Sequence, residues 1–257
     1  MTDPGRTLLA LDFDGTLAPI VDDPAKASIH PGSLAALRRL GPVLQEITII
    51  TGRPVGQVRR LGRFDDEPGL EHLVVCGQYG AEQWYAATGE VHVPHRPQAV
   101  SDLAARLPQW LVEHNASRIR IEDKGLAIAL HTRGVAHGLL DELRPQIEAL
   151  AADVGLHLEP GRQVIELRSA GTDKGQALRR AVDRVKPDAV IFAGDDLGDL
   201  PAFEEGVAMR ERGMDVTLVC SASDEQDALV ARADVVLDGP DAVAVWLGEL
   251  ADRFAPA

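Results

Sequence analysis

Short apolar runs alternate with amphipathic, helix-like stretches along most of this chain. Such runs indicate strands that are buried on both faces, and the alternation is typical of βαβ units around a parallel sheet. The order changes from about residue 98, where it becomes helix, strand, strand, repeated once, and it resumes at residue 173. We therefore predict an α/β protein: a doubly wound, mainly parallel, Rossmann-like core sheet built from residues 1–95 and 169–257, interrupted by an α+β domain over residues 96–168.

The pattern also predicts where the elements lie. In the inserted segment, the turns Asp123-Lys124-Gly125 and Pro160-Gly161-Arg162 would each close a hairpin, because Gly and Pro favour turns. Core strands are expected at 8–14, 46–51, 73–77, 189–193, 216–219 and 235–237, a short hairpin at 80–93, and core helices at 33–44, from 54, and at 173–186, 200–212, 224–232 and 241–254. Inserted helices are expected at 99–114 and 135–154, and inserted strands at 118–122, 126–131, 156–159 and 164–167.

Composition excludes several classes of function. The formal net charge of −14 disfavours nucleic acid as a partner. No apolar run reaches the roughly 18 residues of a membrane span, and the first residues lack a signal-peptide pattern, so we expect no membrane association and a cytoplasmic location. Cys76 and Cys220 lie in apolar runs and are expected to be reduced core residues.

Two carboxylates stand where the first apolar run ends. Asp12 and Asp14 follow that run, and Gly15-Thr16 then turns the chain away. In open α/β sheets, ligands bind at this edge. An Asp there can act as a nucleophile and metal ligand, and a second Asp two residues on can move the proton. An ordinary strand-to-turn junction uses the same residue types, so this motif alone leaves both interpretations open.

Three further polar groups fall at strand ends or at a helix start. The hydroxyl and N–H groups of Thr51-Gly52-Arg53 can hold phosphate oxygens. Lys174 begins a predicted helix, where the helix dipole disfavours a cation unless it neutralises an anion. Asp195, Asp196 and Asp199 would repel one another without a cation and suit Mg²⁺. Taken alone, each signal has an alternative interpretation: a common turn for Thr51-Gly52-Arg53, a solvated side chain for Lys174, and an acidic helix cap for the three aspartates.

In this order, D-x-D-G-T, T-G, K and G-D-D-x-x-D resemble the haloacid dehalogenase superfamily of phosphotransferases. The resemblance covers the whole predicted core and implies a phosphatase mechanism. Asp12 would attack phosphorus and form an aspartyl-phosphate. Asp14 would protonate the leaving oxygen and then activate water. Thr51, Gly52 and Lys174 would bind the phosphoryl oxygens.

The same resemblance implies Mg²⁺ as the cofactor. The Asp12 carboxylate, the main-chain carbonyl of Asp14 and the Asp195 side chain would hold the ion. Asp196 and Asp199 are expected to support the metal or its waters, and Asp199 also to orient the lysine. Charge neutralisation and positioning supply most of the catalysis in such transfers.

The inserted segment resembles the second cap type of the superfamily, and the whole chain resembles the trehalose-6-phosphate phosphatases. In that family, cap residues matching Glu122, Lys124 and Glu166 hydrogen-bond the disaccharide, and such groups can bind several sugar hydroxyls at once. Cross-strand pairing of exposed charges is the alternative. Arg53 is expected to touch the phosphate or the sugar, with a helix-capping ion pair as an equal alternative. The matching segments are 12–20, 80–82, 122–126, 130–131, 164–166, 172–178 and 194–196.

The sequence departs from the family pattern at two places. It has Tyr79-Gly80-Ala81-Glu82 where the family often has His-Gly-x-Glu, and Gly198-Asp199-Leu200 where it often has Thr-Asp-Glu. Because the Asp is retained, the chemistry is expected to survive, while the surroundings of the metal differ. We assign no role to His131.

These inferences predict a phosphoric monoester hydrolase of trehalose biosynthesis, which uses Mg²⁺ to convert trehalose 6-phosphate to trehalose and phosphate. Its partner would be a small sugar phosphate, and we expect a monomer. The alternatives are a phosphatase for sucrose 6-phosphate or a mannosylglycerate phosphate, a phosphomutase, and a non-catalytic sugar-phosphate sensor. The intact core motifs and the short segment before the first strand favour a stand-alone enzyme.

Overall fold

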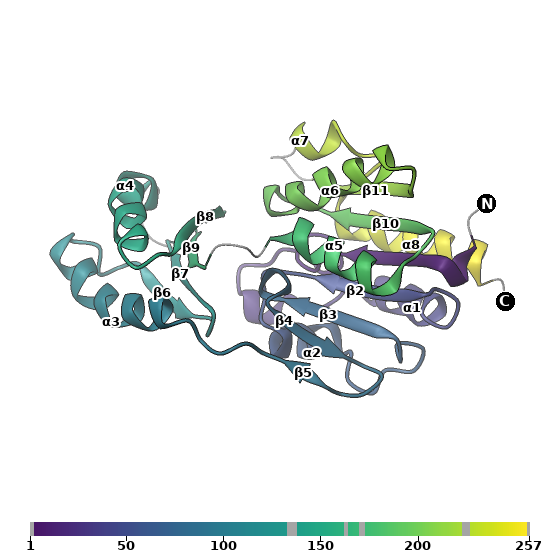
Figure 1. Cartoon of the computed structure of the whole chain (residues 1–257), viewed down its shortest axis with the longest axis horizontal. Coiled ribbons are helices and arrows are strands. Elements are labelled where there is room, and N and C mark those ends of the chain that lie inside the picture. The colour runs from purple at the N-terminus through teal and green to yellow at the C-terminus, as the bar shows by residue number, and fades with distance from the viewer. Residues whose placement is uncertain (1–2, 133–137, 162–163, 170–172, 223–226, 256–257) are drawn as a thin grey trace. The chain divides into compact units, whose positions relative to one another are not determined.

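The computed structural model describes residues 3–132, 138–161, 164–169, 173–222 and 227–255 (Figure 1). The chain forms two compact units, Met1–Val93 with Thr172–Ala257, called the core unit here, and Pro94–Gly171, called the inserted unit. Some predicted features lie outside the described residues: the turn residue Arg162, the helix starts at 135–137 and 224–226, and the segment position Thr172.

The described strands of the core unit form an eight-stranded sheet in the order β12-β11-β10-β1-β2-β3-β4-β5 (Figure 1). Six strands are parallel, whereas β4 and β5 run antiparallel as the predicted hairpin. This order confirms the predicted doubly wound α/β fold. The bounds are β1 Thr7–Leu11, β2 Glu46–Ile50, β3 Leu73–Gly77, β4 Glu82–Tyr85, β5 Val91–His92, β10 Ala189–Gly194, β11 Asp215–Ser221 and β12 Val235–Leu237.

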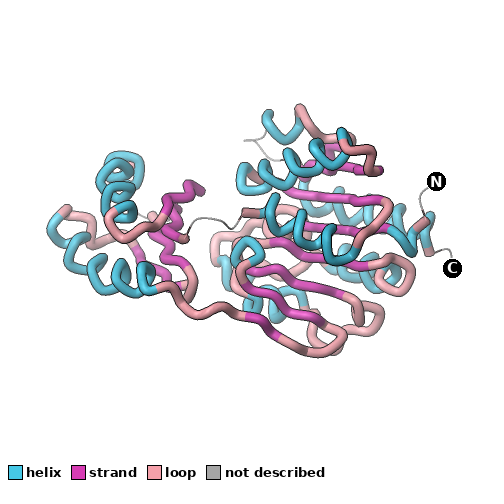
Figure 2. Tube along the Cα trace, viewed as in Figure 1, coloured by secondary structure: helices cyan, strands magenta, loops and turns pink. Residues whose placement is uncertain are grey.

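Helices cover both faces of the core sheet (Figures 1 and 2). Alternate residues of β1 separate the two layers: Leu9 and Leu11 pack on one face, and Leu8 and Ala10 on the other. Because every residue of β1 and β10 is buried, the sequence of these strands is an almost continuous apolar run. One face carries α1 Pro31–Leu40, α2 Val55–Gly62 and α8 Gly239–Phe254, and the other carries α5 Lys174–Val185, α6 Leu200–Glu211 and α7 Asp227–Val230.

Most helix boundaries lie within a few residues of the sequence prediction, and three of the differences have a clear local description. Helix α1 ends at Leu40 rather than at residue 44, because Gly41 and Pro42 follow and Pro42 has no N–H to donate to a carbonyl in the preceding turn. Helix α2 begins at Val55, so Pro54 is its N-cap and not part of its first turn. Helix α7 is a single turn in the described residues.

The inserted unit is a four-stranded antiparallel sheet with two helices on one face. Leu103 and Leu107 of α3 and Ile147 of α4 pack on Ile128 and Leu167 of the sheet. The other face of the sheet therefore carries the polar residues of the strands. The bounds are α3 Gln98–Glu113, β6 Arg120–Asp123, β7 Ala127–His131, α4 Leu139–Ala152, β8 His157–Gly161 and β9 Val164–Arg168, and the sheet order is β6-β7-β9-β8.

Both cysteines are buried and free, as predicted. Each helix in the described ranges is too short or too polar to cross a lipid bilayer.

Candidate active site

The sheet topology brings the predicted core residues to one edge. Strands β1, β2 and β10 are parallel neighbours, so their carboxyl ends meet there. Asp12 follows β1, and its N–H donates to the Ala193 carbonyl at 2.9 Å. Thr51 follows β2, Asp195 follows β10, and Lys174 is the first residue of α5.

The turn after β1 needs a glycine. Gly15 has φ +80°, and a Cβ at this position would lie 2.0 Å from Oδ2 of Asp195. Its N–H donates to the Ala18 carbonyl at 2.7 Å, and the Ser221 hydroxyl donates to its carbonyl at 2.6 Å. The bare backbone of Gly15 therefore lets the Asp195 carboxylate lie directly against the turn that follows Asp12.

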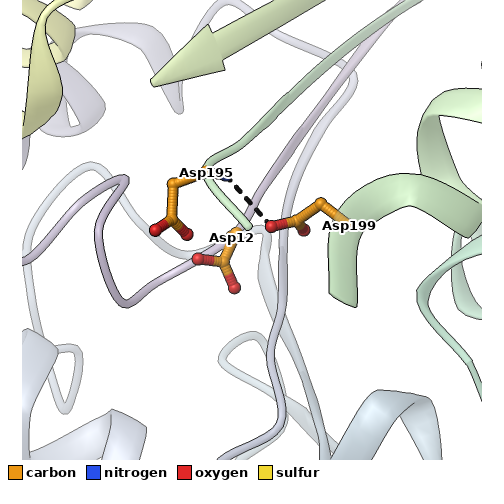
Figure 3. A group of neighbouring side chains, drawn as sticks. All are labelled: Asp12, Asp195 and Asp199. Atoms are coloured by element: carbon orange, nitrogen blue, oxygen red, sulfur yellow. Dashed lines mark hydrogen bonds between the residues drawn. The ribbon is translucent and has the colours of Figure 1, made fainter. Parts of the chain in front are cut away.

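Lys174 joins two carboxylates from different strand ends. Its Nζ donates to Oδ1 of Asp12 at 2.6 Å and to Oδ1 of Asp199 at 2.7 Å. The second Asp199 oxygen accepts from the N–H of Asp195 at 3.0 Å and of Asp196 at 3.2 Å. Figure 3 shows Asp12, Asp195 and Asp199 converging, with one of these bonds dashed. Both oxygens of Asp199 thus hold the lysine and the loop after β10.

The cluster carries more negative charge than one lysine can balance. Burial raises the pKa of Asp12 to about 6, opposed by Lys174. Burial raises the pKa of Asp195 to about 11, and the charges of Asp12 and Asp199 add to the effect. Burial also raises the pKa of Asp199 well above its usual range, but its two oxygens accept three hydrogen bonds. The buried carboxylates therefore titrate as one coupled group, which favours a bound proton or a further cation beside Lys174.

Lys174 stays charged in this setting. Burial alone would lower the pKa of Lys174, but the charges of Asp12 and Asp199 raise it well above its usual value. The helix dipole disfavours a positive charge at the start of α5. The attraction between the Lys174 ammonium and the two carboxylates outweighs this effect.

The described residues fit a divalent cation. Carboxylate oxygens of Asp12, Asp195 and Asp199 lie within 4.8 Å of one another, and all three residues are buried. Oxygen ligands of this type suit Mg²⁺, and a divalent charge would replace the proton that the cluster otherwise retains. Because Asp199 already uses both oxygens, Asp12 and Asp195 are the side chains that would hold the ion.

Asp14 and Arg53 form a two-pronged ion pair. Nε of Arg53 donates to Oδ2 of Asp14 at 2.5 Å, and Nη2 donates to Oδ1 at 2.7 Å. The guanidinium also donates through Nη1 to the Pro24 carbonyl at 2.9 Å and to Oε1 of Gln57 at 3.4 Å. The pair connects the turn after β1 to the turn after β2, a contact that neither of the two predicted roles of Arg53 includes.

The loop after β3 packs against the turn after β2 and hydrogen-bonds to it. The N–H of Tyr79 donates to the Thr51 carbonyl at 2.8 Å, and a Cβ on Gly52 would lie 2.8 Å from the Tyr79 hydroxyl oxygen. The Thr51 hydroxyl accepts from the N–H of Arg53 at 3.2 Å, which leaves its hydrogen to donate elsewhere. Buried Glu82, which lies in one of the segments that resemble the family, accepts from the N–H of Val55 at 2.7 Å and so caps α2.

The open face of the inserted sheet carries the predicted sugar-contacting residues. In the strand register, Glu122 lies opposite Ala129, which lies opposite Glu166. Lys124 Nζ donates to Oε2 of Glu166 at 2.5 Å, while the other Glu166 oxygen is buried with no hydrogen-bond partner among the described residues. Nε2 of His131 lies 2.7 Å from Oε2 of Glu122, and this hydrogen bond lowers the pKa of Glu122.

Sequence reasoning missed three residues of this face. Glu159 lies opposite Glu166 in the register, and Nη2 of Arg168 donates to Glu159 at 2.9 Å. His131, to which we assigned no role, pairs with Glu122. Each carboxylate in the row therefore has its own cationic or imidazole partner. Alternation along the predicted strands could have placed 166 with 168 and 157 with 159 on one face. The predicted hairpin also pairs these two strands, but it does not give the register that sets Glu159 opposite Glu166.

The fold is shared with haloacid dehalogenase-like proteins. A haloacid dehalogenase-like hydrolase from Bacteroides thetaiotaomicron superposes with a TM-score of 0.64 at 16% identity, covering 95% of this chain and 99% of that chain. The C-terminal domain of trehalose-6-phosphate phosphatase from C. albicans superposes with a TM-score of 0.73 at 21% identity, covering 96% and 92%. At these identities the structures establish the fold alone, and they confirm the predicted class.

The trehalose-phosphatase family matches residues 10–235 of the sequence, and the chain therefore belongs to this family. It is similar to a trehalose-phosphate phosphatase of Mycobacterium marinum, with 32% identity over 97% of this chain and 63% of that protein. The chain thus spans less than two thirds of that relative's length. These findings confirm the resemblance identified in the sequence.

Proposed function

We propose that this chain hydrolyses trehalose 6-phosphate to trehalose and phosphate, with Mg²⁺ as the cofactor. The observation that carries the proposal is the buried cluster in which Lys174 bridges Asp12 and Asp199 beside Asp195. Membership of the trehalose-phosphatase family and the similarity to a trehalose-phosphate phosphatase support the choice of substrate.

The first step transfers the phosphoryl group to the protein. A carboxylate oxygen of Asp12 forms a bond to phosphorus, and the bond from phosphorus to the sugar oxygen breaks. Asp14 gives its proton to that leaving oxygen. The Lys174 ammonium and the Thr51 hydroxyl donate to the phosphoryl oxygens, where negative charge accumulates.

The second step hydrolyses the aspartyl-phosphate and regenerates the Asp12 carboxylate. Asp14, now a carboxylate, takes a proton from a water molecule whose oxygen attacks phosphorus. The bond between phosphorus and Asp12 breaks, and its electron pair returns to the carboxylate. Asp199 keeps Lys174 and the loop after β10 in place throughout, because it accepts from both.

Mg²⁺, when bound, would neutralise phosphoryl charge and align the phosphate for in-line attack. The Asp12 and Asp195 side chains and the main-chain carbonyl of Asp14 are the groups that would hold it. Asp196 is exposed and accepts from the N–H of Gly198 at 2.8 Å, so we propose that it acts on the shape of this loop.

The inserted unit is proposed to act as a cap that selects the sugar. Carboxylates and cations of Glu122, Lys124 and Glu166 can each pair with hydroxyls of a disaccharide. The buried Glu166 oxygen without a partner is the kind of acceptor that a sugar hydroxyl satisfies.

A substrate panel tests this function. Phosphate release from trehalose 6-phosphate, sucrose 6-phosphate and glucose 6-phosphate should be compared with Mg²⁺ and with EDTA. We expect release that depends on Mg²⁺ and strongly favours trehalose 6-phosphate. Release from another sugar phosphate alone would refute trehalose 6-phosphate as the substrate. No release from any of the three compounds would refute the proposed phosphatase activity.

A further inference from the structure

The contact between Asp14 and Arg53 conflicts with the role proposed for Asp14. In the structure both Asp14 oxygens accept from the guanidinium, at 2.5 and 2.7 Å. A general acid has to carry a proton on one of these oxygens, and that oxygen would then be a donor facing a donor. Asp14 therefore cannot protonate a leaving group while Arg53 holds it in this way.

Arg53 is placed to exchange partners. Its side chain is 13% exposed and that of Asp14 is 36% exposed, so the pair lies at the open side of the cluster. Nη1 is anchored by the Pro24 carbonyl and Gln57, while Nε and Nη2 face Asp14. The guanidinium can therefore keep its anchor when the two N–H groups that face Asp14 change partner.

A phosphoryl group is the competing partner that the site itself supplies. Arg53 lies two residues after Thr51, whose hydroxyl hydrogen is available to a phosphoryl oxygen. A guanidinium binds phosphate with the same two-pronged geometry that it uses for a carboxylate. A dianionic phosphate also carries more charge than Asp14.

We propose that Arg53 holds Asp14 in the free protein and transfers its guanidinium to the phosphoryl group when substrate binds, which frees Asp14 for proton transfer. This inference rests on the proposed function and adds to it a coupling between substrate binding and the acid–base residue. In the first step the freed Asp14 carboxylate takes up a proton from solvent and gives it to the sugar oxygen as the bond from phosphorus to that oxygen breaks. In the second step Asp14 takes a proton from the attacking water, releases that proton to solvent as phosphate leaves, and pairs with Arg53 again as a carboxylate.

The exchange can be measured without turnover. Isothermal titration calorimetry would give the affinity of inorganic phosphate, in excess Mg²⁺, for the full chain and for Asp14→Asn, Arg53→Met and the double variant. If the two anions share Arg53, Asp14→Asn should tighten phosphate binding about tenfold, or about 1.4 kcal/mol. The same change in the Arg53→Met background should have an effect below about threefold, because the shared group is gone.

Two variants guard the interpretation. Arg60→Met, on the exposed side of α2, is the matched control and should leave phosphate affinity unchanged. Arg53→Lys keeps the charge without the fork and should bind phosphate more weakly than the parent but more tightly than Arg53→Met. Circular dichroism before each titration confirms that the variants are folded.

The outcomes separate the two proposals. An equal gain from Asp14→Asn in both backgrounds would show charge repulsion alone and would overturn the exchange while leaving the phosphatase intact. Loss of affinity in Asp14→Asn would overturn it as well. Failure of the unaltered protein to bind phosphate at millimolar concentration would overturn the exchange, whereas the proposed phosphatase is tested separately by the substrate panel.

Discussion

Replacing Asp199 by Asn should destabilise the core unit far more than the same replacement at Asp196, three residues earlier. Asp199 is fully buried and accepts from Lys174 and from the N–H groups of Asp195 and Asp196. Asp196 is exposed and its side chain accepts from Gly198. The two substitutions are chemically identical, so the difference between them isolates the buried network.

The magnitude follows from the hydrogen bonds. An amide offers one acceptor oxygen, so its NH₂ group must face either the ammonium or the two peptide N–H groups. A hydrogen bond to a charged group contributes about 1.5–3 kcal/mol, and a donor left unpaired adds about 1–3 kcal/mol. We expect the free energy of unfolding to fall by about 3 kcal/mol for Asp199→Asn and by less than about 1 kcal/mol for Asp196→Asn. At about 2–4 °C per kcal/mol, the first corresponds to a fall of about 6–12 °C in the unfolding midpoint.

Differential scanning calorimetry of both variants in EDTA measures the effect without any contribution from metal. A scan with Mg²⁺ should show that Asp199→Asn also loses much of the stabilisation by the ion, because the loop that carries Asp195 is no longer held. Equal shifts for the two variants would refute the reasoning, since they would show that the buried carboxylate network contributes nothing beyond an exposed loop.

Three further predictions concern the metal site and the sugar face. Because burial raises the folded-state pKa of Asp12 to about 6 and of Asp195 to about 11, the metal-free fold binds protons that the unfolded chain releases near pH 4, so its stability falls as pH rises through this range. Mg²⁺ replaces those protons and should raise the unfolding midpoint more at pH 8 than at pH 5; an equal or larger effect at pH 5 would contradict this. Gly15→Ala places a Cβ 2.0 Å from Asp195 and should weaken Mg²⁺ binding about tenfold or more by calorimetry, whereas Gly213→Ala, at φ +92° with nothing within 4 Å, should not change it. Glu166→Gln should raise KM for trehalose 6-phosphate about tenfold and leave turnover of 4-nitrophenyl phosphate unchanged; the same KM for Glu166→Gln and for Glu148→Gln, on an exposed position of α4, would remove Glu166 from sugar binding.

The sequence was sufficient to predict the fold because each apolar run is confined to one strand. The run that became β1 is buried at every position, so its apolar character was unbroken, and the edge where Asp12, Thr51 and Asp195 meet followed from parallel topology. Helix ends were predicted less accurately where apolar residues continued beyond the end of the helix. Apolar Leu44 extended the predicted helix past Pro42, but it packs in the core from the loop after α1.

Side-chain partners were the part that residue patterns could not supply. Asp14 and Arg53 are 39 residues apart, and their pairing depends on the angles at which two loops leave the sheet. The pairing of Glu159 with Arg168 likewise depends on the register of β8 against β9, which the predicted hairpin alone does not give. That Lys174 contacts Asp199 was expected from the family resemblance, but its simultaneous bond to Asp12 required coordinates.

The central claim is that Asp12 attacks phosphorus in trehalose 6-phosphate, and it is tested most directly by phosphate release from that substrate with Mg²⁺, measured for the unaltered protein and for Asp12→Asn. Asn keeps the shape of the side chain but is not a nucleophile. We predict turnover by the unaltered protein and none above background for the variant, with circular dichroism showing that both are folded. Release by Asp12→Asn within about tenfold of the unaltered rate, a difference of about 1.4 kcal/mol in the barrier, would contradict the account.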